Sequence, residues 1–153
     1  MSGPEERLTE LGLSVPEVAK PVAAYVPAVR TGNHIYTSGQ LPFREGSLIL
    51  TGKVGGDVTL DQAVGCAQQC ALNGLAAIKS LVGDLSSVVR VVKVVVFVAS
   101  TPDFTGQPGV ANGASELLGK VFGDKGQHAR SAVGVSVLPL DAPVEVELVV
   151  EVS

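Results

Sequence analysis

Aromatic residues are scarce in this sequence, which contains no tryptophan, two tyrosines and four phenylalanines. Hydrophobic residues still make up 46% of the 153 positions, and most of them are Val, Ala and Leu. A core of small and β-branched side chains favours a sheet on which helices pack. Because a chain of this length normally buries a single core, we expect one domain over residues 1–153.

The chain also lacks a cluster of basic residues, and its formal net charge is −4. A surface that neutralises a nucleic-acid backbone needs a basic patch, so we expect no nucleic-acid partner. The longest apolar run, Val88 to Ala99, is too short to span a bilayer and contains Arg90 and Lys93. The first residues, Met1 to Leu13, have no apolar run typical of a secretory signal. We therefore expect no membrane partner and a cytoplasmic location.

Cysteine is scarce as well. Cys66 and Cys70 are the only two, and they lie four residues apart in a segment with helical periodicity. No further ligands are suggested nearby, so we expect two buried free thiols and no metal site. The absence of a disulfide framework is typical of a reducing compartment.

Turn and capping residues divide the chain into helices and strands. Ser2 and Glu5 have the spacing of a capping box, and Thr59 is suited to be the N-cap of a long helix. Periodicity and turn signals predict helices over 4–11, 60–82 and 110–122, and strands over 28–30, 34–40, 47–50, 88–98, 129–138 and 144–152. This order predicts an α+β fold, in which two long helices cover one face of a sheet of five or six strands. The residues 141–143 predict a hairpin turn that pairs the last two strands.

In the last predicted strand, one face is apolar and the other is mixed, because Val144, Val146, Leu148 and Val150 alternate with Glu145, Glu147 and Val149. The second face of the sheet must therefore meet something, and burial against copies of the same chain predicts a homo-oligomer.

No standard catalytic motif is complete in this sequence. The stretch from Gly46 to Val54 resembles a phosphate loop, but it has five residues between its glycines, and a phosphate loop has four. Val54 also stands where the loop needs a hydroxyl side chain. The glycines at 106, 109 and 113 have the wrong spacing for a dinucleotide fingerprint, and no nucleophile elbow is present.

Arg130 stands out because it lies at the start of an otherwise apolar strand. A guanidinium in a cleft needs an anion, which is either Glu145 on the strand expected beside it or a ligand carboxylate held by the planar fork. Glu145 itself either orients a water or is an ordinary solvated acid. Tyr25, Ser38 and Asn112 offer hydrogen bonds, and each alone is unremarkable.

Several sequence blocks taken together resemble the Rid family, also called YjgF/YER057c/UK114 and often labelled endoribonuclease L-PSP or translation initiation inhibitor. The blocks are Tyr25-Val26, Gly32 to Pro42 with its Thr-Ser-Gly-Gln-x-Pro run, Phe97-Val98, Asp103-Phe104, Ala129-Arg130-Ser131, Leu138-Pro139 and Val144 to Glu147. The resemblance covers Tyr25 to Val152, so the helix near the N-terminus is a short extension to a single Rid-like domain.

The resemblance implies a chorismate-mutase-like fold with a mixed sheet, a homotrimer, and clefts between neighbouring subunits. In the deaminase branch these clefts hydrolyse enamines and imines to 2-keto acids and ammonia, with no cofactor or metal. Arg130 matches the residue that holds the substrate carboxylate, and Glu145 matches the acid that positions water. The matching positions that line the cleft are Tyr25, Ser38, Gly39 and Asn112.

The sequence departs from the deaminase branch at Ala132, which stands where that branch usually has cysteine. This substitution leaves the identity of the substrate open. The first hypothesis is therefore an enamine/imine deaminase. The second is a non-catalytic protein that binds 2-keto acids in the same cleft. A third, endoribonuclease or translation inhibitor, rests on family labels alone, and the acidic composition speaks against it.

Overall fold

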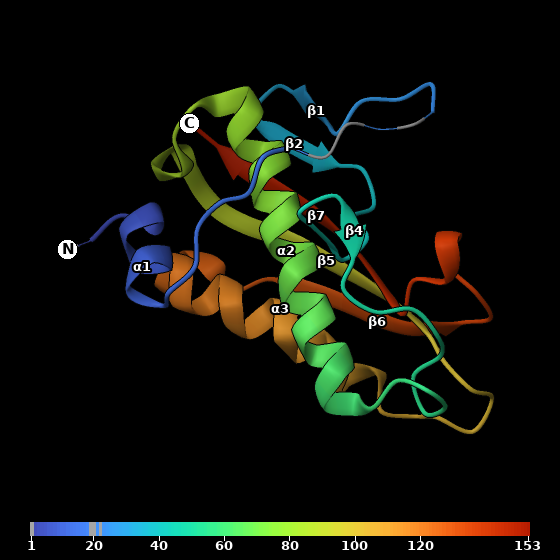
Figure 1. Cartoon of the computed structure of the whole chain (residues 1–153). Helices are drawn as coiled ribbons and strands as arrows, with labels where there is room; N and C mark the ends of the chain where they lie inside the picture. Colours follow the sequence, from blue (N-terminus) through green and yellow to red (C-terminus); the bar gives the residue numbers. More distant parts are fainter. Residues whose placement is uncertain (1, 19–20, 22) are drawn as a thin grey trace.

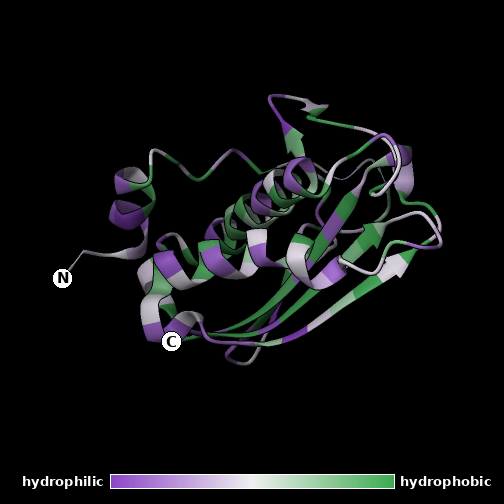
Figure 2. Ribbon diagram, turned by 90° about the horizontal axis from the view of Figure 1, so that it is seen from below, coloured by the Kyte–Doolittle hydropathy of each residue, from purple (hydrophilic) through white to green (hydrophobic). Residues whose placement is uncertain are grey.

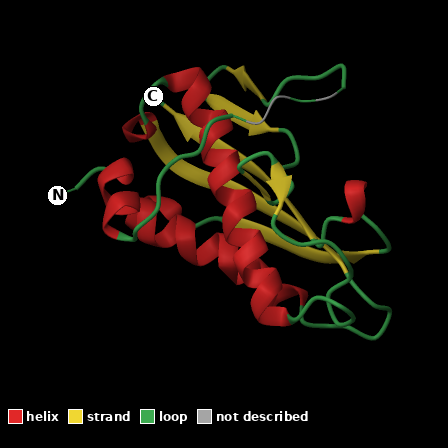
Figure 3. Ribbon diagram, in the orientation of Figure 1, coloured by secondary structure: helices red, strands yellow, loops and turns green. Residues whose placement is uncertain are grey.

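The protein is described by a computed structural model that covers residues 2–18, 21 and 23–153. In chain order, the elements are α1 (Pro4–Glu10), β1 (Ala28–Thr31), β2 (His34–Thr37), β3 (Phe43–Arg44), β4 (Ser47–Leu48), α2 (Leu60–Val82), β5 (Val88–Ala99), α3 (Gln107–Phe122), β6 (Ala129–Val135) and β7 (Val144–Val152). The two long helices, α2 and α3, lie side by side on one face of the sheet (Figures 1 and 3). The predicted α+β class and helix placement are therefore confirmed.

Helix α2 begins and ends where its sequence predicts. Thr59 Oγ1 accepts a hydrogen bond from the backbone of Gln62 at 3.2 Å, and the Gln62 side chain accepts one from the backbone of Thr59 at 3.0 Å. Gly83 ends the helix with a φ of 81°, a conformation that glycine adopts without strain. These two caps fix the helix that carries most of the buried apolar contacts to the sheet.

The capping box predicted for α1 is wrong. The helix starts at Pro4, so the N-cap falls on Gly3, which has no side chain to accept a hydrogen bond. Glu5 is used elsewhere, because it pairs with Lys79 Nζ of α2 at 3.1 Å and accepts from the backbone of Leu85 at 3.2 Å. These contacts attach α1 to the rest of the domain.

The main sheet has five strands in the order β1-β2-β7-β5-β6, and β3 and β4 form a separate hairpin. The sheet is mixed, because β5 and β6 are parallel while the other neighbours are antiparallel. The valine-rich β5 takes a central place, as its composition predicts, since β7 and β6 pair with its two edges and the helices cover one of its faces.

The predicted hairpin between the last two strands is wrong. β5 lies between β6 and β7, so the segment 136–143 crosses the end of β5 instead of making a tight turn. Eight residues are more than a β-hairpin normally uses. Helix α3 carries the chain from β5 to the parallel β6, and β7 then pairs with the free edge of β5.

The core lies between the helices and one face of the sheet. Val144, Val146, Leu148 and Val150 of β7 are all buried on that side. The opposite face keeps apolar side chains in solvent, among them Val29, Tyr36 and Val133, which are 52%, 50% and 44% exposed. Figure 2 shows hydrophobic residues along strands that the two long helices cover from one side only.

Cys66 and Cys70 are buried free thiols on α2, as predicted. Burial raises the pKa of the Cys66 thiol to about 11. In the part of the chain that the structure describes, no three His, Cys, Asp or Glu side chains are grouped as metal ligands. None of the described helices has the length and apolar character needed to cross a bilayer.

Candidate active site

Arg130 lies on β6, the edge strand, and its side chain turns toward α3. Its Nη1 donates to Asn112 Oδ1 at 2.8 Å and to Ser115 Oγ at 3.2 Å. Asn112 and Ser115 are three residues apart, so they lie on the same face of α3. Helix and strand together therefore hold one end of the guanidinium group.

No carboxylate compensates this charge among the described residues, whose two ion pairs are Lys53 with Asp141 and Lys79 with Glu5. Arg130 is half-buried, and its Nε–H and Nη2–H groups make no hydrogen bond within the described part of the chain. A planar cation with two unused donors fits a carboxylate in two parallel hydrogen bonds. The geometry favours the ligand alternative that the sequence left open.

The alternative ion pair between Arg130 and Glu145 is wrong. Arg130 pairs in register with Val94, whose side chain is buried under the helices, whereas Glu145 pairs with Phe97 and alternates with the buried Val144. The two charged groups therefore lie on opposite faces of the sheet. They are also separated by two strand spacings, about 10 Å, and by three residues along the strand, about another 10 Å.

Glu145 is held against the end of β2. A Cβ on Gly39 would overlap the Glu145 carboxylate, so only glycine leaves room for it. Gln40 forms a backbone bridge with Val146, which fixes this approach. Partial burial, and to a lesser degree the negative charge of Glu147, raise the pKa of the Glu145 carboxyl. A raised pKa makes a carboxyl better suited to exchange protons near neutral pH.

Ser38 and Tyr25 belong to the same region as Glu145. Ser38 Oγ donates to the carbonyl oxygen of Val26 at 2.6 Å, and Ser38 N donates to Pro27 O at 2.8 Å. These bonds bring the segment carrying Tyr25, whose side chain is 54% exposed, beside the residue that precedes Gly39. We call Tyr25, Ser38, Gly39 and Glu145 the acid half-site.

Ala132 lies two residues after Arg130 and therefore on the same side of β6. Its side chain is partly buried and packs against the core. We call Arg130, Asn112 and Ala132 the arginine half-site. The structure thus separates the seven predicted residues into two groups, with Arg130 and Ala132 on one face of the sheet and Glu145 on the other.

Two polar residues beside the arginine half-site were not predicted from the sequence. Ser115 accepts from Arg130, and its Oγ also lies 2.9 Å from His128 Nε2. The signal for Ser115 is its position three residues after Asn112 on the predicted helix. His128 has the weaker signal of alternation, since it stands two residues before Arg130 on an extended segment.

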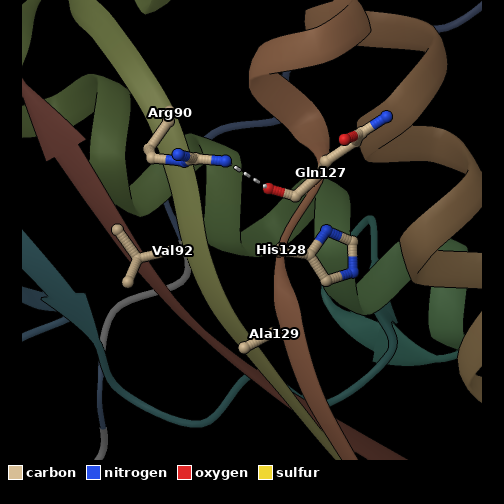
Figure 4. A pocket seen from close by; sticks show the side chains of 5 residues that line it. All are labelled: Arg90, Val92, Gln127, His128 and Ala129. Carbon is tan, nitrogen blue, oxygen red and sulfur yellow. Dashed lines mark hydrogen bonds between the residues drawn. The ribbon is translucent and has the colours of Figure 1, made fainter.

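A hollow of about 370 Å³ opens beside the start of β6, lined by Arg90, Val92, Gln127, His128 and Ala129 (Figure 4). Arg90 Nη2 donates to the backbone carbonyl of Gln127 at 3.3 Å, as the dashed line marks. Of the residues that line the hollow, His128 is the one that also contacts the arginine half-site, through Ser115.

The family model described as "YjgF/chorismate mutase-like, putative endoribonuclease" matches residues 5–152. The chain belongs to the YjgF family. The resemblance carried by the Thr-Ser-Gly-Gln-x-Pro and Ala-Arg-Ser blocks is therefore confirmed, and so is the chorismate-mutase-like fold.

Relatives in the YjgF family carry different names. Protein TCP17 of Trypanosoma cruzi is 44% identical over 147 residues, which cover 95% of this chain and 92% of that protein. A 2-iminobutanoate/2-iminopropanoate deaminase of Dermatophagoides farinae is 31% identical over 141 residues, 92% of this chain and 95% of that protein. The crystal structure of Atu1372 from Agrobacterium tumefaciens, a protein of unknown function, matches with a TM-score of 0.92 and 47% identity over 98% of this chain and 92% of its own.

Proposed function

We propose that this protein is an enamine/imine deaminase, which hydrolyses reactive 2-imino acids to 2-keto acids and ammonia. The observation that carries the proposal is Arg130, a half-buried cation held by α3, which has two donors unused and forms no ion pair within the described part of the chain. The deaminase of Dermatophagoides farinae, 31% identical, supports the reaction class.

Imine hydrolysis needs only a bound carboxylate, one positioned water and a group that transfers protons. The carboxylate of the imino acid binds the free edge of Arg130, and one water adds to the carbon of the C=N bond. Glu145 accepts a proton from that water, the imine nitrogen gains a proton, and the resulting carbinolamine releases ammonia as its C=O bond forms. Positioning a water and an acid beside an electrophilic carbon accounts for the rate gain.

We propose further that the protein is a homotrimer whose clefts join the arginine half-site of one subunit to the acid half-site of the next. The support is geometric, because Arg130 and Glu145 lie on opposite faces of one sheet and cannot meet around one small substrate. Val29, Tyr36 and Val133 on the open face are apolar side chains that a neighbouring subunit would cover.

Subunit mixing tests this arrangement. Arg130→Ala and Glu145→Gln trimers, each inactive alone, are unfolded together and refolded as mixed trimers. Random mixing gives about a quarter of the sites both original residues, so about a quarter of the wild-type activity should return. Activity is measured by generating an imine with an amino-acid oxidase and trapping what remains with semicarbazide. Mixtures that stay inactive, although light scattering shows trimers, would contradict a site shared between subunits.

A non-catalytic binding protein is the alternative outcome of the same experiments. It uses the same Arg130 and predicts that 2-oxobutanoate raises the melting temperature while imine trapping is unchanged. The endoribonuclease in the family description is a different matter, because the net charge of −4 disfavours a phosphate backbone.

A further inference from the structure

Arg130 is the first member of a chain of hydrogen bonds that ends on the backbone. Its Nη1 contacts Ser115 Oγ at 3.2 Å, Ser115 Oγ contacts His128 Nε2 at 2.9 Å, and His128 Nδ1 contacts the carbonyl oxygen of Gly126 at 2.6 Å. Ser115 and His128 are both half-buried, whereas Asn112, the other acceptor on Nη1, is exposed. The contact through Ser115 is therefore the better protected of the two.

The direction of each hydrogen bond follows from the groups at the two ends. A carbonyl oxygen only accepts, so Nδ1 of His128 carries a proton and donates it to Gly126. A guanidinium only donates, so Ser115 Oγ accepts from Arg130. With His128 in its neutral form, Nε2 is an acceptor and takes the hydrogen bond that the Ser115 hydroxyl donates. Every donor and acceptor in the chain is satisfied in this one arrangement.

We propose that Ser115 and His128 are positioning residues for substrate binding, a role that rests on the proposed function of Arg130. His128 fixes the hydroxyl rotor of Ser115, and Ser115 together with Asn112 occupies both hydrogens of Nη1. The guanidinium then cannot turn, and its Nε–H and Nη2–H edge stays available to the substrate carboxylate. A side chain held in one rotamer loses less entropy when the ligand binds.

The test compares the affinity for 2-oxobutanoate, measured by calorimetry, with imine hydrolysis. Ser115→Ala and His128→Ala should each weaken binding about five-fold, equivalent to about 1 kcal/mol, and should raise KM with little change in kcat. Because the two residues act in series, the double variant should be no weaker than either single variant. Ser115→Thr keeps the hydroxyl and should bind within about two-fold of wild type.

Two controls separate positioning from a general loss of stability. His128→Gln places an amide oxygen where Nε2 accepts from Ser115 and should retain most of the affinity. Ser80→Ala removes a helix hydroxyl that donates to Ala77 on α2, far from Arg130, and should leave binding unchanged. The Nε–Hε resonance of Arg130 in the unliganded protein adds a readout independent of activity, since Ser115→Ala should broaden it.

The outcomes distinguish this inference from the proposed function. If Arg130→Ala weakens binding at least ten-fold while Ser115→Ala and His128→Ala bind and turn over as wild type does, the positioning role is overturned and the deaminase stands. If Arg130→Ala itself binds and turns over normally, the proposed function fails, and the positioning role fails with it.

Discussion

The Glu145 carboxylate rests directly on the backbone of Gly39, in space that any other side chain at position 39 would fill. Gly39 follows Ser38, whose hydroxyl ties the end of β2 to the segment before β1. The glycine therefore fixes where the acid lies, although it contributes no functional group.

Gly39→Ala should consequently lower imine hydrolysis, by about ten-fold, because the added methyl displaces the Glu145 carboxylate. The overlap is with the flexible end of a side chain, so the melting temperature should change little. Gly65→Ala is the matched control, since a Cβ at that α2 position meets nothing within 4 Å. Equal activity of Gly39→Ala and wild type would show that Glu145 is not held for catalysis.

Arg130→Lys and Arg130→Ala should both weaken the binding of 2-oxobutanoate. Charged hydrogen bonds contribute about 1.5–3 kcal/mol, so the alanine variant should lose about ten- to a hundred-fold in affinity. Lysine keeps the charge but not the two parallel donors, and its affinity should lie between those of alanine and wild type. Arg90→Ala removes another arginine near the same sheet edge, and calorimetry on that variant should give the wild-type value.

Glu145→Gln should stabilise the protein at neutral pH while it abolishes hydrolysis. Burial raises the pKa of this carboxyl above its ordinary value of 4.5, so the folded state binds the proton more tightly than the unfolded state. The stabilisation that the Glu145 carboxyl contributes is fully present below its pKa in the unfolded state. It is lost as the pH rises through its pKa in the folded state.

Thermal unfolding at about pH 4 and about pH 7 tests this pH dependence. The melting temperature of Glu145→Gln should exceed that of wild type only at the higher pH. Glu116→Gln, which neutralises an exposed acid on α3, should not show such a difference. A lower melting temperature for Glu145→Gln than for wild type at about pH 7 would mean that the fold stabilises Glu145 as an anion.

Glu147→Gln should move the acidic limb of the pH–rate profile to lower pH. The charge of Glu147 is the second cause of the raised pKa of Glu145, and its removal lowers that pKa. The maximum rate should persist, since Glu147 is not placed in either half-site. An unchanged limb would show that a group other than Glu145 controls it.

The secondary structure could be predicted from local signals. Thr59 and Gly83 mark both ends of α2 in the sequence, and Thr31-Gly32-Asn33 marks the hairpin of β1 and β2. The order of the strands could not, because residues 141–143 resemble a hairpin turn and nothing local says that β5 lies between the strands on either side of them. Strand order depends on which strand pairs with a neighbour along both of its edges, and that depends on the pairing of all strands in the sheet.

The candidate site shows the same division. Arg130 and Glu145 were recognised from their residue types and sequence blocks, which also identified the family. Their placement on opposite faces, and the attachment of Arg130 to His128 through Ser115, depend on register and on α3 packing against β6. The sequence alone determined the helices and strands, the family and the types of functional group available, because these follow from short-range patterns. Only the tertiary structure decided which of these groups share a face, because that depends on pairings between strands far apart in the chain.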